Sequence, residues 1–330
     1  MASPEPLLRV HDLRVTFETK RGAVWAVDGV NLEVGTGEVV GIVGESGSGK
    51  SVTLRAIARI LHANARVSGS VLWRGEDLLT MPPARLRGVR GADIAMIFQE
   101  PMTALNPVLP IGLQIDEALV AHTHLGRNAR RKRTIELLGQ VGIPSAAARL
   151  SNYPHEFSGG MRQRAMIAIA LAANPKLLLA DEPTTALDVT IQDQILKLLL
   201  RLVGELGMAM VLVTHDLGVV AETCDRMAVM YAGRIAETGP VRAIFERPRH
   251  AYTYALLNSM PDGGRAREPL APIPGQPPRL DQPIEGCPFV PRCTYATEVC
   301  LVRPPLILVG PEHTSACTAA NQLPAWRVPA

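Results

Sequence analysis

The chain has 330 residues, of which 47% are hydrophobic, 20% charged and 4% aromatic, and its formal net charge is +3. This length allows two domains, and the hydrophobic fraction is enough to bury a sizeable core. So small a net charge predicts neither a nucleic-acid partner nor binding to an acidic membrane surface, and so few rings argue against a base-stacking platform.

The chain carries no sequence signal for crossing or entering a membrane. Its longest apolar runs, such as residues 165–173, fall short of the roughly 20 residues that a membrane-spanning helix needs. The first residues, MASPE, lack the basic region and apolar core of a secretory signal. We therefore expect the chain to lie in the cytoplasm.

Residues 7–43 alternate short apolar segments with turns and predict antiparallel strands that lead into an apolar strand at residues 39–43. Phe17 and Trp25 are the aromatic candidates for stacking on an adenine ring. The alternatives are a core strand residue for Phe17 and a surface residue for Trp25.

The run GESGSGKS at residues 44–51, called the P-loop below, lies between that strand and a helix-compatible stretch at residues 52–58. This strand, glycine-rich turn and helix match the G-x-x-x-x-G-K-[ST] unit, in which backbone N–H groups converge on nucleotide phosphates. The expected nucleotide-binding residues are Gly44, Ser46, Gly47, Ser48, Gly49, Lys50, Ser51 and Val52.

Two of these side chains have distinct expected roles. Lys50 should reach the β- and γ-phosphates, and Ser51 should offer its hydroxyl to Mg²⁺, which needs hard oxygen ligands. The alternative is a glycine-rich turn that merely joins a strand to a helix, but the flanking and downstream elements agree with the phosphate site.

Residues 68–75 predict a hairpin, and residues 94–98 predict a strand that ends at Gln99. The Gln99 amide can offer its oxygen to Mg²⁺ and its N–H groups to water, whereas Pro101 and Pro107 should break any helix. Taken alone, Gln99 would be an ordinary loop residue.

From about residue 101 to 152 the pattern becomes helical, with a second helix at residues 134–141. The basic run at residues 130–133 is interpreted as a solvated helix face.

Residues 157–164, FSGGMRQR, open a further helix. Ser158 occupies the N-cap position, and Gly159 and Gly160 expose backbone N–H groups, so this is a second potential phosphate site, although S-G-G alone is weak support.

Two carboxylates, Asp181 and Glu182, follow the apolar run at residues 177–180, which predicts a strand buried on both faces. Ligands of an open α/β sheet lie at the carboxyl ends of its strands, so we expect both acids beside the P-loop. Asp181 should then hold Mg²⁺, and Glu182 should polarise the water that attacks the γ-phosphate. The alternative is a pair of surface acids that close a strand.

The run ALD at residues 186–188 precedes an amphipathic helix, and a second buried strand at residues 210–214 ends at His215. His215 could contact the γ-phosphate and the attacking water, although a lone histidine is more often structural. Cys224 stands apart from the other cysteines and is expected to be simply buried.

The tail of the chain begins with a proline-dense stretch, residues 261–285, which suits a semi-extended connector and includes Pro261 and Pro269. Four cysteines with the spacing C-x5-C-x6-C-x16-C follow. They are Cys287, Cys293, Cys300 and Cys317. In a reducing cytosol such a group favours an iron–sulfur or metal site over disulfides, with structural zinc (His313 replacing one cysteine) or four free, packed thiols as alternatives.

Six motifs occur in the order and approximate spacing of an ABC-transporter ATPase subunit, which the chain resembles from about residue 7 to 261. They are the P-loop, Gln99, the S-G-G-M-R-Q run, the Asp181–Glu182 pair, the ALD run and His215. The usual L-S-G-G-Q reads F-S-G-G-M here, which leaves the phosphate-facing S-G-G intact. This variant and the run MIFQEPMTALNP at residues 96–107 resemble the dipeptide/oligopeptide importer subfamily.

The resemblance implies an α/β P-loop NTPase fold, with a RecA-like core, an antiparallel β subdomain and a helical insert, plus a small cysteine-rich C-terminal extension. We expect an ATPase domain at residues 1–260, with its helical subdomain at about 101–164, and the linker and extension at residues 261–330. Two such subunits face each other head to tail, so Ser158, Gly159 and Gly160 would complete the ATP site of the opposite subunit.

The resemblance also implies residue roles. Glu182 would act as general base, His215 would contact the γ-phosphate, and Gln99 would link Mg²⁺ and water to the membrane partner, while Lys50 completes the catalytic set. Mg²⁺ would be held by Ser51, Gln99 and Asp181. The four tail cysteines would hold a [4Fe–4S] cluster, with zinc as the second choice.

The expected function is ATP hydrolysis that energises a bacterial importer of di- or oligopeptides, at the cytoplasmic face of the inner membrane. The partners would be two permease subunits, a second, related ATPase subunit and, indirectly, an extracytoplasmic peptide-binding protein, with no nucleic acid. The alternatives are nickel, glutathione or another small solute, and a soluble ABC ATPase outside transport.

Overall fold

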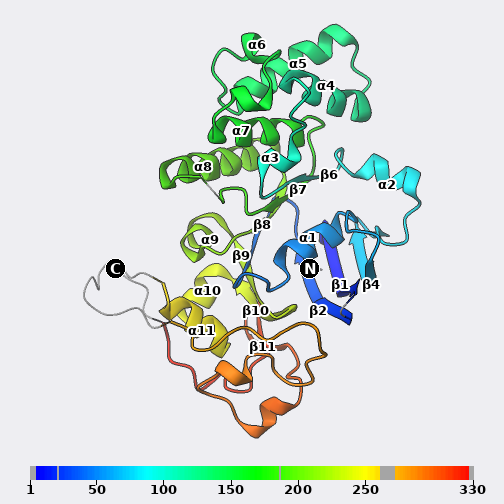
Figure 1. Ribbon diagram of the computed structural model, residues 1–330. Coiled ribbons are helices and arrows are strands. Elements are labelled where there is room, and N and C mark those ends of the chain that lie inside the picture. The colour runs from blue at the N-terminus through cyan, green and yellow to red at the C-terminus, as the bar shows by residue number, and fades with distance from the viewer. Residues whose placement is uncertain (1–4, 21, 186, 261–271, 327–330) are drawn as a thin grey trace. The chain divides into compact units, whose positions relative to one another are not determined.

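The computed structural model of the chain describes residues 5–20, 22–185, 187–260 and 272–326 (Figure 1). The chain forms two compact units, the first made of residues 1–34, 39–79 and 213–330 and the second of residues 35–38 and 80–212. Ala186, Pro261 and Pro269, which belong to motifs named above, lie outside the described residues.

The first unit contains an antiparallel sheet with the strand order β2-β1-β4-β5. Its strands are β1 (Leu8–Thr19), β2 (Gly22–Val34), β4 (Ala65–Trp73) and β5 (Glu76–Asp77). The antiparallel strands expected before the P-loop strand are therefore confirmed. The predicted hairpin also forms, but its second arm begins at Glu76, because Arg74 and Gly75 both take positive φ and make the two-residue turn.

The same unit contains five further strands, in the order β11-β12-β10-β9-β3, of which β3 leads into the P-loop. They are β3 (Val39–Val43), β9 (Arg226–Tyr231), β10 (Arg234–Pro240), β11 (Ile307–Gly310) and β12 (His313–Ser315). Every residue of β3 is buried, as its unbroken apolar run predicts, and β3 pairs in parallel with β9. Sequence analysis missed β11 and β12, which come from residues 272–326, called the C-terminal segment below.

Helices and 3₁₀ turns complete the first unit. They are α1 (Lys50–Ile57), α9 (Leu217–Thr223), α10 (Val241–Glu246), α11 (Ala251–Asn258), η2 (Val290–Arg292) and η3 (Glu298–Leu301). One apolar cluster joins Val43 and Tyr231 of the sheet to Phe289 and Leu323 of the C-terminal segment. The C-terminal segment is thus part of the core of this unit.

The second unit has the strand order β8-β7-β6, from β6 (Ile94–Ile97), β7 (Leu177–Asp181) and β8 (Ala209–Val213). Its helices are α2 (Pro83–Val89), α3 (Pro101–Ala104), α4 (Ile111–His122), α5 (Arg127–Gln140), α6 (Ala146–Arg149), α7 (Gly159–Ala170) and α8 (Val189–Leu206), with the 3₁₀ turn η1 (Pro154–Glu156). All five residues of β7 are buried, as expected.

Two expectations about the helical stretch need correction. Pro101 does not break a helix but starts the short α3, because the missing N–H and fixed φ of proline suit the first helical position. The second long helix begins at Arg127 rather than at residue 134, so the basic run lies within α5, where Arg130 pairs with Asp116 at 2.7 Å. Among the described helices, none is both long and apolar enough to cross a bilayer.

Candidate functional site

The P-loop connects β3 to α1 and contains two glycines, Gly44 and Gly49, at which a side chain would overlap neighbouring backbone atoms. Gly44 and Gly49 have φ values of 152° and 101°. A Cβ on Gly44 would overlap the carbonyl oxygen of Met230, and one on Gly49 would overlap that of Ala26. No side chain caps the N-terminus of α1, and the first N–H groups of a helix are the groups that bind an anion at such a site.

Lys50 is the first residue of α1, and its side chain is buried against the loop. Its Nζ donates to the carbonyl oxygens of Gly44 at 2.7 Å and Glu45 at 2.9 Å. The loop carbonyls therefore fix where the ammonium group lies, next to the N–H groups that would hold phosphate. This places Lys50 in the predicted cradle.

His215 belongs to the same unit as the P-loop. The preceding residue, Thr214, donates its backbone N–H to the carbonyl oxygen of Ile42 at 3.2 Å, two residues before Gly44. His215 itself is exposed, and Asp216 caps α9 by accepting from Gly218 N at 2.8 Å. The local chain path therefore brings His215 to the strand end from which the P-loop departs.

The carboxyl end of β7 lies in the second unit and carries Asp181 and Glu182. Asp181 is fully buried. Glu182 takes a positive φ of 46°, an uncommon conformation for a residue with a side chain. Gln99 Nε2 donates to Glu182 Oε2 at 3.0 Å, and Thr185 Oγ1 donates to the same oxygen at 2.8 Å. The structure thus brings together the predicted Gln99 and Glu182.

Sequence analysis missed Thr185. The sequence signal that could have indicated it is a threonine in a turn, three residues after a carboxylate at a strand end, because threonine hydroxyls commonly hydrogen-bond to groups nearby in the chain. Here the hydroxyl shares one carboxylate oxygen with the Gln99 amide and restricts the orientation of Glu182.

Ser158 caps α7 as predicted, with Ser158 Oγ accepting from Met161 N at 3.3 Å. Ser158 and Gly159 are exposed. The helices α7 and α8 lie side by side (Figure 1), and a Cβ on Gly160 would meet the Ile191 side chain of α8 at 3.0 Å. The small residue therefore allows close packing, while the N-terminus of α7 remains at the surface.

The predicted site residues are divided between the two units. The P-loop, including Ser51, and His215 belong to the first unit. Gln99, Asp181, Glu182 and residues 158–160 belong to the second. Of the adenine candidates, Phe17 and Trp25 are both half-buried in the antiparallel sheet, and their role stays a prediction.

The four tail cysteines are all free thiols in one neighbourhood. Burial raises the pKa of Cys287 to about 11, and the nearby thiols of Cys317, Cys300 and Cys293 add to this rise. Burial also raises the pKa of Cys293 and Cys317. For Cys300 burial acts in the same direction, but hydrogen bonds with Thr318 and Thr297 outweigh it and lower the pKa.

In number and chemistry these thiols suit a soft metal. Within the described ranges, however, no group of three or more His, Cys, Asp or Glu side chains is arranged as a metal-ligand set. His313, the alternative zinc ligand, has its Nε2 2.7 Å from Glu237 Oε1. The four thiols lie in one neighbourhood, but within the described residues they are not positioned to bind one metal ion together.

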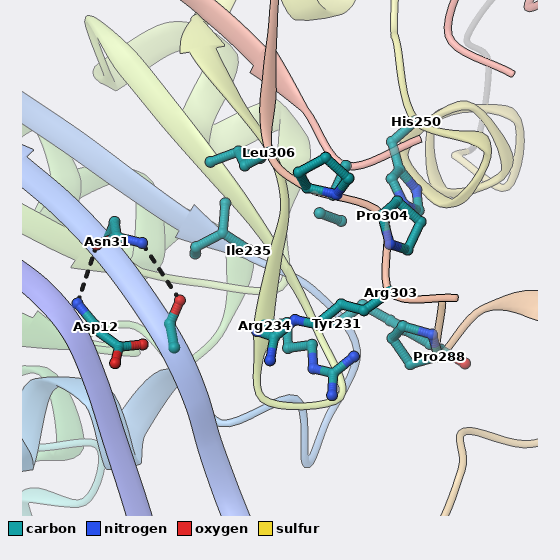
Figure 2. A pocket seen from close by; sticks show the side chains of 14 residues that line it. Asp12, Asn31, Tyr231, Arg234, Ile235, His250, Pro288, Arg303, Pro304 and Leu306 are labelled. Carbon is teal, nitrogen blue, oxygen red and sulfur yellow. Dashed lines mark hydrogen bonds between the residues drawn. The ribbon is translucent and has the colours of Figure 1, made fainter. Parts of the chain in front are cut away.

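A cavity of about 370 Å³ lies where the C-terminal segment meets the rest of the first unit (Figure 2). Asn31, Arg234 and His250 line it together with Pro288 and Arg303. Asn31 accepts from Asp12 N at 3.0 Å and faces it in this view. None of the predicted nucleotide-binding residues lines this cavity, so we assign it to the packing of the C-terminal segment.

Two family models match the chain: the ABC transporter family over residues 27–185 and the C-terminal region of oligopeptide/dipeptide transporters over residues 236–300. A putative peptide import ATP-binding protein of Brucella abortus is 51% identical over 314 residues, covering 94% of each chain. The oligopeptide transport ATP-binding protein OppD of Salmonella typhimurium is 48% identical over 318 residues, covering 96% of this chain and 95% of that one.

Solved structures agree with this fold. A dimeric ATP-binding cassette in a post-hydrolysis state, bound to ADP and Pi, is 30% identical with a TM-score of 0.64 and covers 71% of this chain and 99% of that one. A cassette from Clostridium perfringens, part of an ABC transporter complex, is 29% identical with a TM-score of 0.61, covering 73% of this chain and 91% of that one. The chain therefore belongs to the ATP-binding proteins of ABC transporters and carries the C-terminal region of the oligopeptide/dipeptide transporters.

Proposed function

We propose that this ABC-type ATPase energises the import of di- or oligopeptides into a bacterial cell. The observation that carries the proposal is the similarity, at about 50% identity over nearly the whole chain, to proteins named as peptide import ATP-binding proteins. The match to the oligopeptide/dipeptide C-terminal region supports the same substrate class.

In the proposed reaction the P-loop N–H groups and Lys50 bind the phosphates of ATP. Ser51, Gln99 and Asp181 are the proposed holders of Mg²⁺, which when bound would neutralise phosphate charge. Glu182 would accept a proton from the attacking water, oriented by the hydrogen bonds from Gln99 and Thr185. His215 would contact the γ-phosphate.

We also propose that residues 158–160 act on the ATP site of a second, related ATPase subunit. The exposed N-terminus of α7 supports this, since its first N–H groups and the Ser158 hydroxyl can reach a phosphate outside their own unit. The similarity to a dimeric cassette bound to ADP and Pi supports the same arrangement.

Two permease subunits are the proposed membrane partners, which would hold this chain at the cytoplasmic face of the inner membrane. Exposed apolar side chains in the second unit, at Met102, Val108, Leu113 and Val120, offer the contact surface. A groove of about 540 Å³ that includes Leu113 and Arg131 lies on the same unit. An extracytoplasmic binding protein would deliver the peptide.

The proposal is tested by uptake of a radiolabelled tripeptide in cells that lack their own peptide importers and express this chain with its permeases, its partner ATPase and its binding protein. Uptake should require ATP and should be lost in Lys50→Ala. Uptake of nickel or glutathione instead of peptide would overturn the substrate class. A chain that stays in the soluble fraction when the permeases are present would overturn the role in transport.

For the tail, we propose that the four cysteines hold a [4Fe–4S] cluster, with zinc as the second choice. The number of thiols and their shared neighbourhood support this proposal, although their present arrangement is not that of a ligand set. Anaerobic purification with iron, sulfide and zinc analysis tests it. About four irons and four sulfides per chain are expected, whereas zinc alone or no metal would overturn the cluster.

A further inference from the structure

Arg292, at the end of η2 in the C-terminal segment, reaches the P-loop. Only 4% of its side chain is exposed. Its Nη1 donates to Glu45 Oε2 at 2.7 Å and its Nη2 to Glu45 Oε1 at 2.9 Å, a two-pronged ion pair. Its other donors contact Tyr231 Oη at 3.1 Å, Pro274 O at 2.7 Å and Ile273 O at 3.4 Å. Every N–H group of the guanidinium therefore has an acceptor.

Glu45 is the residue after Gly44 in the P-loop, and it is held at both backbone atoms as well as at its carboxylate. Its N–H donates to Tyr252 Oη at 2.8 Å. Its carbonyl oxygen accepts from Lys50 Nζ at 2.9 Å and from Ser48 N at 3.2 Å. The carboxylate that Arg292 holds thus belongs to the residue whose carbonyl holds the P-loop lysine.

An aromatic cluster fixes the arginine. Phe289 of the C-terminal segment packs on Tyr231 and Tyr252, with ring centroids 5.4 Å apart in each pair. The Arg292 guanidinium lies 5.8 Å from the ring centroid of Tyr231 and 5.9 Å from that of Phe289. The hydrogen bonds with Glu45 raise the pKa of Arg292 above its usual range, so the group stays charged. Arg292 therefore has little freedom to leave the loop.

We infer that Arg292 is a positioning residue for the P-loop, through which the C-terminal segment sets the affinity of the chain for ATP. Arg292 is buried and Glu45 is half-buried. Removing the arginine would leave the Glu45 carboxylate without its ion-pair partner, so Glu45 would move toward water and take its backbone with it. That movement would displace the carbonyl bound to Lys50. The inference concerns nucleotide binding and is independent of which solute is transported.

The test uses the purified full chain and two measurements: displacement of a fluorescent ATP analogue by Mg-ATP, and steady-state ATP hydrolysis. Arg292→Met should raise the Kd and KM for ATP by about tenfold, with kcat changed less than about twofold. Arg303→Met is the matched control. Arg303 belongs to the same segment, but its ion pair, at 3.3 Å, is with Asp28 of β2 rather than with a P-loop residue. Its Kd for ATP should stay at the wild-type value.

Glu45→Gln distinguishes positioning of the P-loop from a purely structural role of Arg292. It removes the ion pair but leaves the hydrogen bonds from Arg292 to Pro274 and Tyr231 in place. It should weaken ATP binding as Arg292→Met does, and the exchanged pair Glu45→Arg with Arg292→Glu should recover part of the loss. If Arg292→Met does not fold, the ATP affinity of Glu45→Gln is the deciding measurement. Wild-type ATP affinity in Glu45→Gln, or a lowered melting temperature in Arg292→Met with unchanged Kd, would overturn the inference. A failure of peptide uptake would leave it untouched, since no peptide enters these assays.

Discussion

The side-chain amide of Gln99 donates to the carboxylate of Glu182 across 3.0 Å, and both residues follow buried strands of the second unit. The bond links the residue proposed to orient water to the residue proposed to take its proton. Thr185 donates to the same oxygen at 2.8 Å, so two hydrogen bonds restrict the orientation of the carboxylate. A base that is already oriented loses less entropy on reaching the transition state.

Replacing Glu182 by Gln should separate ATP binding from hydrolysis. The amide keeps the shape of the side chain but cannot accept a proton, so single-turnover hydrolysis should fall by about 100-fold or more, with the Kd for Mg-ATP within about twofold of wild type. Thr185→Val, which removes only the orienting hydroxyl, should cost less than about tenfold. Normal hydrolysis by the Glu182→Gln protein would show that another group is the base.

Two P-loop glycines should respond differently to alanine. At Gly49 a methyl group would overlap the Ala26 carbonyl, so Gly49→Ala should distort the loop and lower ATP affinity by more than about tenfold. At Gly47 a Cβ would have no neighbour within 4 Å, and only the strain of its positive φ remains. Gly47→Ala should therefore cost about 1 kcal/mol of stability. Equal effects in both variants, measured by ATP titration and thermal unfolding, would contradict this steric explanation.

His250 should make the fold sensitive to acid. Burial lowers the pKa of its imidazole from 6.5 to about 4, and its Nδ1 accepts from Tyr252 N at 3.0 Å, which requires the neutral ring. The unfolded chain binds the proton below about pH 6.5 and the folded chain does not, so stability falls as the pH drops toward 4, by about 3 kcal/mol in total.

The check is urea unfolding of wild type and His250→Asn at pH 7.5, 6.0 and 5.0. Asn can still cap α11, so the variant keeps an acceptor for Tyr252 N. The difference in unfolding free energy between the two proteins should shift in favour of the variant as the pH falls. A difference that stays constant across the three pH values would refute the role of His250.

Cys224 should be unreactive in the folded protein. Burial raises the pKa of its thiol to about 11, which leaves only about one thiolate in a thousand at pH 8. Iodoacetamide should therefore label Cys224 about 100-fold more slowly in the folded chain than in urea, as read by mass spectrometry of its tryptic peptide. Rapid labelling of the native chain would show that Cys224 is accessible and ionised.

Features with local signals were predictable from the sequence. The buried strands β3 and β7 follow from continuous apolar runs, and the Ser158 cap follows from its position before α7. The pairing of Gln99 with Glu182 also agrees with the expectation that both serve one reaction. For the strands and the cap a few adjacent residues carry the information, whereas Gln99 and Glu182 are 83 positions apart and are brought together only by the fold.

What could not be predicted depends on residues far apart in the chain. Arg292 meets Glu45 across 247 positions, and no pattern around either residue indicates the other. The sequence offers His313 as an alternative zinc ligand, but His313 pairs with Glu237, which lies on β10. The strands β11 and β12 are short and lack strong alternation. They form because β12 pairs with the edge of β10 and β11 pairs with β12.

The pairing of β12 with β10 has a consequence for how the chain can be cut. Without β12, the backbone groups of β10 at Glu237 and Thr238 would lose their partners and become an open edge, which invites association with other chains. Buried Glu237 would also lose the imidazole of His313. A chain truncated at residue 260 should therefore expose this edge and associate with other chains, so the C-terminal segment protects the edge of its own sheet.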